Sequence, residues 1–469
     1  MKKNLNINVP IKPVLDHEFI PAKLWNDSYR DLVAEEGGVS VIIYLQQNNG
    51  NVFSYKAKVL ELSEGNEDLS VKYIERLVKF LLWQKGGCRI TIEGNANVVD
   101  PLVSKLKAIY SSEGKRSFDC EFIGSKIYGK ALEIEGCSEG SFALKSQSKV
   151  SSLGRNLEGC RIGFDLGGSD RKCAALIDGK VVYSEEITWD PYFQSDHNYH
   201  YEGIQNSLKN AAAHLPRVDA IGGSAAGVYV DTEVRAGSLF RGVSDEDFEK
   251  HVQRIFFKVK EDWGNVPFEV VNDGEVTALA GSMSIGKNAV LGISLGTSQA
   301  VGYVNSDGFI EPWLNELAFA PVDYREEVAQ DEWSGDFGCG VQYFSQQAIN
   351  RLLKPAGIDL SDEMPFPEKL KAVQALMIEG DERAKNIYQT IGAYLGYSLL
   401  HYAEFYEIEN LLLLGRVTTG EGGDIIINEA KRVLKTIDPA FFEKLRFSTP
   451  SETDKRHGQA IAAASLPKI

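Results

Sequence analysis

RIGFDLGGS, residues 161–169, is the stretch of this sequence from which its fold can be inferred. Its first half is an apolar run typical of a buried strand, which ends at the carboxylate of Asp165 before Gly167 and Gly168. Glycines in such a turn let backbone N–H groups approach a phosphate, while Asp165 could hold Mg²⁺ through water and Ser169 could add a hydroxyl group. The alternative is a plain hairpin, because short glycine turns are common.

A second turn of the same kind follows later in the chain. The β-rich run Val290–Ser294 leads into the turn Leu295–Ser298, and a further β-rich run comes after it. Two strand-turn-strand units suggest two like halves that face each other across a cleft, where two sets of backbone donors could hold one nucleotide. This arrangement suits phosphoryl transfer, and the predicted phosphate-binding residues of the second turn are Gly296, Thr297 and Ser298.

Between the two turns, a carboxylate follows another predicted strand. The strand Phe268–Val271 leads into Asn272 and Asp273, where a helix with small residues begins. In this position Asp273 could act as a general base that takes the proton from an acceptor hydroxyl as it attacks the γ-phosphoryl group. The alternative role of Asp273 is helix N-cap, which is the commoner task of an aspartate.

A fully apolar strand near the C-terminus, Asn410–Leu414, is followed by a loop that begins with Gly415 and Arg416. A loop after a buried strand lies at the edge of an open α/β sheet where ligands usually bind. We therefore expect Gly415 and Arg416 to contact the nucleotide, although a core strand followed by a turn explains the same residues.

Composition and charge argue against several classes of protein. Apolar residues make up 43% of the chain and charged residues 25%, which is typical of a folded globular protein. The net charge of −16 gives no general attraction for nucleic acid or an anionic membrane, so we predict neither as a partner. No apolar run reaches the roughly 18 to 20 residues of a membrane span, and the N-terminus lacks the apolar stretch of a signal peptide, so we expect a cytoplasmic location. The six scattered cysteines favour reduced thiols over a disulfide framework.

The chain is long enough for two or three domains. A polar stretch at 146–154 predicts a linker, and before it two β-rich runs flank Asn49-Gly50, a pair typical of a tight hairpin turn. Helical and strand patterns then alternate up to the linker. The predicted parts are an accessory α/β domain of unknown role at 1–155, an N-terminal kinase lobe at 156–280 and a C-terminal kinase lobe at 281–469.

Together, these motifs resemble the ROK family (repressors, open reading frames and sugar kinases) of the actin, hexokinase and Hsp70 superfamily. The resemblance covers residues 160–469, with short motifs in the family's order and spacing. It implies an α/β fold in which two actin-like, ribonuclease H-like lobes flank a nucleotide cleft, with ATP and Mg²⁺ as cofactors and a homodimer as the assembly. It also implies that Asp273 is the catalytic base and that the ATP phosphates contact Asp165, Gly167, Gly168, Gly296 and Thr297.

The sequence departs from the ROK pattern in the segments that bind sugar and zinc in that family. Glu316 remains from the family's Glu-x-Gly-His segment, but Phe319 stands in place of the histidine. Of the three cysteines of the zinc loop only Cys339 remains, and one cysteine without a nearby histidine cannot form a closed zinc site, so we predict no zinc. Val341 replaces a sugar-binding glutamate, for which Gln342 could substitute.

Three functions fit these observations. The first is an ATP-dependent kinase for a hydroxyl group of a sugar or sugar-like molecule, in which Asn272, Glu316 and Gln342 contact the acceptor. The second is a non-catalytic nucleotide- or sugar-binding regulator, which would account for the lost sugar contacts. The third is an ATPase or an acid kinase. ROK repressors bind DNA through an N-terminal helix-turn-helix, whereas residues 1–155 are nearly neutral and begin with strands, which argues against that version.

Overall fold

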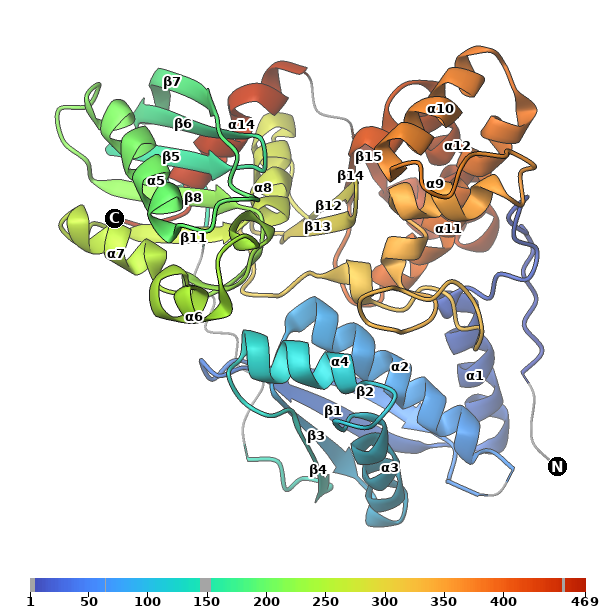
Figure 1. The fold of residues 1–469 in the computed structure, drawn as a ribbon. Helices are drawn as coiled ribbons and strands as arrows, with labels where there is room; N and C mark the ends of the chain where they lie inside the picture. The colour runs from blue at the N-terminus through green and yellow to red at the C-terminus, as the bar shows by residue number, and fades with distance from the viewer. Residues whose placement is uncertain (1–4, 64, 144–152, 449–451) are drawn as a thin grey trace.

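The computed structural model describes the whole chain except residues 1–4, 64, 144–152 and 449–451. It has the α/β fold class predicted from the sequence, with two lobes side by side and an N-terminal part (blue) below them in the view of Figure 1. Most of the predicted linker at 146–154 lies outside the described residues.

The N-terminal part is a helix-covered sheet. Its elements are α1 (Ala22–Glu36), β1 (Val39–Gln46), β2 (Val52–Val59), α2 (Glu67–Lys85), β3 (Arg89–Gly94), α3 (Ala96–Ile109), α4 (Ser117–Asp119), a π-helix (Cys120–Ile127) and β4 (Glu133–Ser138). The strand order is β2-β1-β3-β4. The predicted hairpin is confirmed, with Gln46 opposite Val52 and Gly50 at φ 89° in the turn. Helix α1 is one that our sequence analysis does not predict.

The first lobe contains a five-stranded sheet in the order β11-β8-β5-β6-β7. Its elements are β5 (Cys160–Leu166), β6 (Asp170–Ile177), β7 (Lys180–Thr188), α5 (His197–Ala212), β8 (Ala220–Ala225), β9 (Val228–Val230), β10 (Glu233–Ala236), α6 (Asp245–Asp247), a π-helix (Phe248–Val252), α7 (Ile255–Asp262), β11 (Phe268–Asn272) and α8 (Asp273–Ile285). The central strand β5 runs antiparallel to β6 and parallel to β8, and β8 is parallel to β11. The carboxyl ends of three parallel strands therefore meet at one edge.

The second lobe repeats this pairing in a smaller sheet, in the order β13-β12-β14-β15. Its elements are β12 (Val290–Leu295), β13 (Gln299–Val304), α9 (Gln346–Leu353), α10 (Phe366–Ile378), α11 (Glu382–Tyr402), β14 (Asn410–Leu414), α12 (Glu421–Ile437), α13 (Pro439–Lys444) and β15 (Arg446–Ser448). Strand β12 is antiparallel to β13 and parallel to β14, as β5 is to β6 and β8. Within the described residues, the sheet has no counterpart of β7. Val304 of β13 pairs with Val290 of β12, and it also forms an isolated bridge with Ile310.

The C-terminal helix α14 (Glu452–Ala464) belongs with the first lobe, which corrects our placement of all residues 281–469 in the second. It packs on β5, β8 and α8. Gly163 of β5 permits this contact, because a Cβ atom there would lie 1.7 Å from the carbonyl oxygen of Ala460. At the other end of the chain, the segment before α1 lies on α11, where the Ile11 N–H donates to the Tyr397 hydroxyl over 3.1 Å.

Candidate active site

The first lobe gathers its predicted functional carboxylates at the carboxyl ends of its parallel strands. Asp165 at the end of β5 pairs in register with Ser224 of β8, and Asn272 at the end of β11 pairs with Ala225. The Ser224 hydroxyl donates to Asp165 Oδ1 over 2.6 Å. Strand register thus brings Asp165 to the same edge as the start of α8, where Asp273 lies, as the sequence predicts.

Burial raises the pKa of Asp165 to about 6, because few water molecules can solvate its charge. The hydrogen bond from Ser224 acts in the opposite direction, and the negative charge of Asp273 raises the pKa further. A cation at this edge would relieve the charge of both carboxylates. The chemistry of Asp165 is therefore that of a ligand to a hard cation such as Mg²⁺, directly or through water.

The N-cap of α8 is Asn272 rather than Asp273. The Asn272 Oδ1 atom accepts from the Gly274 N–H over 2.7 Å, while its Nδ2 donates to the Gly227 carbonyl oxygen over 2.6 Å. Asp273 is the first helical residue, and its Oδ1 accepts from the Gly274 N–H at 3.0 Å. Asp273 is therefore not needed as the N-cap, which was the alternative to its role as general base. The Asn272 amide, which we predicted to contact the acceptor, already makes hydrogen bonds through both its oxygen and its nitrogen.

Asp273 lies where the two lobes meet. The start of α8 packs on β13 of the second lobe, since a Cβ atom at Gly302 would lie 2.2 Å from the Gly274 carbonyl oxygen. Burial raises the pKa of Asp273, and the Gly274 N–H counteracts this shift. A buried carboxylate with a raised pKa is suited to accept a proton near neutral pH.

The first glycine turn is compact and partly covered. The Gly167 N–H donates to the Asp170 carbonyl oxygen over 2.9 Å, and the Ser169 hydroxyl donates to Asp170 Oδ2 over 2.8 Å. Tyr192 covers Gly168, since a Cβ atom at Gly168 would lie 1.9 Å from the Tyr192 hydroxyl. The Ser169 hydroxyl predicted to bind phosphate is therefore occupied, and Tyr192 must move before a phosphate can reach Gly168.

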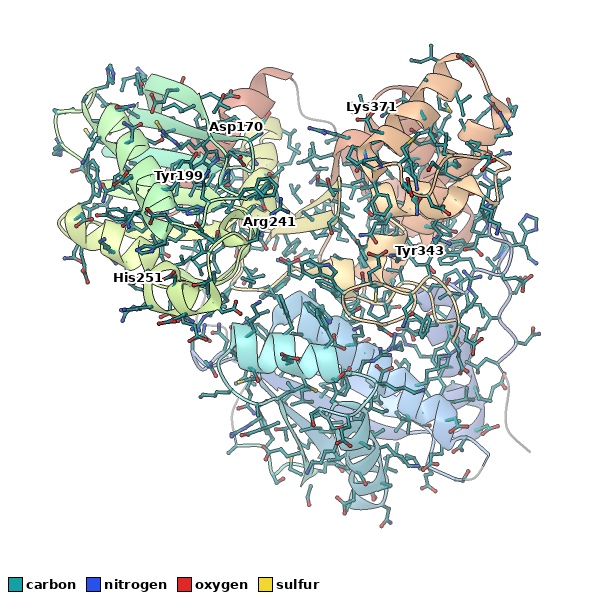
Figure 2. All side chains as sticks on the ribbon, in the orientation of Figure 1. Asp170, Tyr199, Arg241, His251, Tyr343 and Lys371 are labelled. Atoms are coloured by element: carbon teal, nitrogen blue, oxygen red, sulfur yellow. The ribbon has the colours of Figure 1, made fainter. Side chains whose placement is uncertain are left out.

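Arg241 is a cation beside this turn that our sequence analysis does not identify. Its guanidinium group stacks on the Tyr192 ring at 4.2 Å and on the Phe193 ring at 5.0 Å. Figure 2 shows Arg241 and Asp170 on the side of the first lobe that faces the second lobe. A loop arginine carries no local sequence signal of such a position, since it is placed by packing of the loop.

The second glycine turn is open. The Gly296 N–H donates to the Ser298 carbonyl oxygen over 2.9 Å, and the nearest atom to a Cβ at Gly296 would be that same oxygen at 3.5 Å. Thr297 and Ser298 are exposed. A ligand can therefore approach the backbone here without displacing a side chain.

The predicted nucleotide loop lies beside the second turn. Strands β12 and β14 align Ser294 with Leu414, so Gly415 follows next to Leu295. Gly415 has φ 97°, and a Cβ atom there would lie 2.3 Å from the Leu295 carbonyl oxygen. Glycine is required at this position, and the exposed Arg416 after it lies at the same sheet edge as the turn.

Glu316 is held by the N-terminal part. The N–H groups of Asn315 and Glu316 donate to the carbonyl oxygens of Gln84 and Trp83 at the end of α2, each over 2.9 Å. Burial, followed by the negative charge of Asp273, raises the pKa of Glu316 to about 7. The charge of Asp273 therefore acts on Glu316 as it acts on Asp165.

The segments that depart from the family pattern also face the N-terminal part. Phe319 packs against Trp83 with ring centroids 4.5 Å apart. Asp336 pairs with Lys79 at 3.2 Å and with Arg76 at 3.3 Å. Burial holds the pKa of the Cys339 thiol well above its usual range, so this sulfur stays protonated.

Gln342, predicted to contact the acceptor, donates from Nε2 to Gln347 Oε1 over 2.6 Å. Within the described residues, the second amide proton and the side-chain oxygen of Gln342 make no further hydrogen bond, so the contact with an acceptor stays a prediction.

Two histidines that the sequence separates come together at the outer end of the first lobe. Ligand atoms of His197, Asp247 and His251 lie within 4.8 Å of one another. The two imidazole rings are stacked in parallel, with centroids 4.1 Å apart. The lone pair of a ring nitrogen lies in the ring plane, so two parallel stacked rings do not direct their nitrogens at one ion. We assign no metal to this group.

Known proteins are similar to this chain in structure but not in sequence. No protein-family model matches the chain, and no curated protein sequence matches it. A ROK hexokinase from Thermus thermophilus matches by structure with a TM-score of 0.52 and 16% identity, over 66% of this chain and 97% of the hexokinase. A ROK family transcriptional regulator, a homologue of the E. coli MLC protein, matches with a TM-score of 0.52 and 19% identity, over 66% of this chain and 79% of the regulator.

This chain has the ROK sugar-kinase fold. The predicted resemblance of the two lobes is thereby confirmed at the level of fold. Of these two neighbours, one is a kinase and the other is a regulator. The fold alone therefore does not decide whether this chain is a kinase or a non-catalytic regulator. No helix of the part of the chain that the structure describes is long and apolar enough to cross a membrane.

Proposed function

We propose that this protein transfers the γ-phosphoryl group of ATP to a hydroxyl group of a sugar or sugar-like acceptor, with Asp273 as general base. The observation that carries the proposal is the strand register that brings Asp165 to the same edge as Asp273, at the point where α8 meets β13 of the second lobe. The pKa values of Asp165, Asp273 and Glu316 are all raised, and perturbed pKa values are typical of active sites.

The residues present fit Mg-ATP. Asp165 is a buried carboxylate suited to a hard cation. The N–H groups of Gly167 and Gly296 are bonded within their turns, so a phosphate would meet the neighbouring N–H groups of Gly168, Thr297 and Ser298. Mg²⁺ would neutralise charge on the phosphate oxygens. We assign phosphate binding to Gly167 and Gly168 in the first lobe and to the turn Gly296–Ser298 in the second, with Gly415 and Arg416 next to the nucleoside.

The chemical step places one proton on Asp273. The acceptor hydroxyl oxygen forms a bond to the γ-phosphorus, the bond between that phosphorus and the β,γ-bridging oxygen breaks, and ADP leaves. The hydroxyl proton passes to the Asp273 carboxylate. Glu316 accepts a hydrogen bond from another hydroxyl of the acceptor and so orients it, while the lobes exclude water that would otherwise be phosphorylated in its place.

The second candidate function, a non-catalytic regulator, is favoured by two observations. Tyr192 covers Gly168, and Phe319 is used in packing against Trp83 rather than for polar contact with a sugar. In addition, a ROK family transcriptional regulator is among the solved structures with this fold. A regulator would bind nucleotide or sugar without forming ADP.

Turnover of Asp273→Asn separates the two candidates. Coupled detection of ADP with a panel of sugars and polyols should show acceptor-dependent turnover, and Asp273→Asn should lower kcat by about 10² to 10⁴ with nucleotide affinity nearly unchanged. Asp245→Asn is the matched control, because Asp245 is also the first residue of a helix of the first lobe, after the N-cap Ser244, and is exposed. Full turnover of Asp273→Asn would remove Asp273 from the mechanism, and ligand binding without ADP formation would favour the regulator.

A further inference from the structure

A cavity of about 430 Å³ lies where all three parts of the chain meet. We call it the junction cavity. The N-terminal part contributes Gln47, Asn49 and Tyr128 to its wall, the first lobe contributes β11 and the β9–β10 hairpin, and the second lobe contributes the segment 310–316. Its volume is within the range of about 300 to 1,000 Å³ that small-molecule sites usually have.

The junction cavity begins next to the proposed base and extends away from it. Asn272 and Glu316 line it, whereas Asp273 does not. An acceptor whose reacting hydroxyl lies at Asp273 can therefore place another part of itself in the cavity. The far end of that part would meet the turn between β1 and β2, where Asn49 lies.

The wall provided by the N-terminal part is fixed before any ligand binds. Gln47 donates from Nε2 to the Lys85 carbonyl oxygen over 2.7 Å and to the Pro312 carbonyl oxygen over 2.9 Å. Its Oε1 accepts from Asn51 Nδ2 over 2.8 Å. One side chain thus ties the β1–β2 turn to α2 and to the second lobe, which reduces the entropy cost of ordering the wall on binding.

The lining of the junction cavity is acidic and aromatic. Lys260 is the one basic residue in the wall, which also contains the carboxyl groups of Asp231, Glu269, Glu275, Glu311 and Glu316. Tyr229 supplies aromatic surface. The Trp313 ring is stacked on Tyr303 and covered by Lys85 Nζ, and its buried Nε1–H has no acceptor in the described part of the chain. Burial raises the pKa of Glu275 to about 8 and that of Glu316 to about 7, so these carboxyl groups can donate as well as accept hydrogen bonds. The other acidic residues of the wall outnumber Lys260 and repel anions, while an aromatic ring covers the C–H face of a sugar.

We infer that the junction cavity binds the non-reacting part of the acceptor and that the acceptor is a neutral or amine-bearing glycoside of at least two sugar rings. One ring presents its hydroxyl to Asp273 between the lobes, and the next ring occupies the cavity against the N-terminal part. The N-terminal part is therefore a specificity element of the site. This inference rests on the proposed function for the position of the reacting hydroxyl.

Binding without nucleotide tests the inference independently of turnover. Isothermal titration calorimetry would compare glucose with maltose and cellobiose, glucosamine with its β-1,4 dimer, and cellobiose with cellobiouronic acid. At least one neutral or amine-bearing disaccharide should bind tenfold or more tightly than its monosaccharide, and the uronic acid should bind at least tenfold more weakly than cellobiose. Disaccharides that bind no more tightly than monosaccharides, or do not bind at all, would overturn the inference.

Asn49→Trp tests the role of the N-terminal part. Asn49 is exposed in a turn, so an indole there fills the far end of the cavity without entering a packed core. It should weaken disaccharide binding at least tenfold more than monosaccharide binding. The matched control is Asn97→Trp, at an exposed position of α3 outside the cavity wall, which should leave both affinities within twofold. Equal effects of Asn49→Trp on both ligands would contradict the inference.

The two proposals fail in different ways. Selective disaccharide binding with no ADP formed from ATP would contradict the kinase proposal. The junction cavity would then be the sugar-binding site of a regulator. ADP formation with monosaccharides alone, and no selective disaccharide binding, would sustain the kinase and remove the role of the cavity.

Discussion

The two lobes share a strand order but differ in how they enclose their cores. The first lobe has a hydrophobic core of its own around Phe164, Phe256 and Phe268. The second lobe shares one continuous core with the N-terminal part, in which Trp83 of α2 and Tyr394 of α11 belong to the same cluster. The N-terminal part thus shares its core with the second lobe, whereas the first lobe meets the second lobe through a separate cluster that α8 and α14 form with β12, β13 and β14.

The difference between the lobes begins after β13, because within the described residues no strand pairs with β13 as β7 pairs with β6. After β13, the chain of the second lobe makes a bridge at Ile310 and then runs along the end of α2, where Asn315 and Glu316 bond to the Gln84 and Trp83 carbonyl oxygens. The helix α2 therefore supports the segment that carries Glu316. The segments in which the sequence departs from the ROK pattern lie against this same helix, since Phe319 packs on Trp83 and Asp336 pairs with Lys79.

The largest effect on stability is expected from Asp336→Ala. Asp336 faces Arg76, Lys79 and Arg116, and its removal leaves these three buried cations with only Glu75 and Asp119 as acidic partners. Breaking a buried ion pair on one side costs about 3–5 kcal/mol. Urea denaturation, followed by tryptophan fluorescence and circular dichroism, should show this loss in one transition, because the N-terminal part and the second lobe share a core.

The control for Asp336→Ala is Arg217→Ala in the first lobe, whose exposed pair with Asp219 should contribute less than about 1 kcal/mol. Two separate unfolding transitions, with only the fluorescence of Trp25 and Trp83 shifted, would contradict the shared core of the N-terminal part and the second lobe. The N-terminal part would then be an independent domain.

Local patterns predict the parts of the site that one strand and its turn can build. Asp165 and Gly415 follow apolar strands, and parallel pairing then brings each to the predicted edge. Contacts between distant segments carry no local signal, so neither Tyr192 over Gly168 nor Trp83 against Phe319 could be predicted. Asp273 is the only N-cap that we considered from the sequence, whereas the neighbouring Asn272, which can also cap a helix, caps α8 in the structure.

Phe319→His tests whether Phe319 belongs to the shared core. Its ring lies 4.5 Å from that of Trp83 and 5.5 Å from that of Phe118. An imidazole there lacks hydrogen-bond partners and should cost about 2–3 kcal/mol, with a larger loss below pH 6.5, where the unfolded chain binds a proton more readily. Phe319→Leu, which stays apolar, should cost less than about 1.5 kcal/mol. Unchanged stability with a gain in sugar affinity would place residue 319 in the acceptor site.

Glu404→Gln tests the link between α1 and the end of α11. Arg30 binds both Glu404 oxygens, at 2.8 and 2.7 Å, and Lys23 lies 3.0 Å from one of them. Burial alone would raise the pKa of Glu404, but these cations and His401 lower it to about 2. A lowered pKa stabilises the fold above the unfolded value of 4.5, and the gain is lost as the pH falls toward 2. Glu404→Gln should therefore cost about 2 kcal/mol at pH 7 and flatten the acid limb of a thermal-denaturation series, whereas the exposed Glu382→Gln should change neither.

Glu316→Gln should produce the smallest change in the free energy of unfolding, and it should stabilise the protein rather than destabilise it. Glu316 lies at the junction with the first lobe rather than in the shared core. Its pKa is raised to about 7, so the folded state holds a proton that the unfolded chain releases above about pH 4.5. Stability therefore falls as the pH rises from 4.5 through 7, and the neutral amide should add about 1–2 kcal/mol at pH 8 and almost nothing at pH 4. Melting temperatures at both pH values would check this. A loss of stability at pH 8 would mean that a cation neutralises the Glu316 carboxylate, and the carboxyl groups would then no longer count as strain held for catalysis.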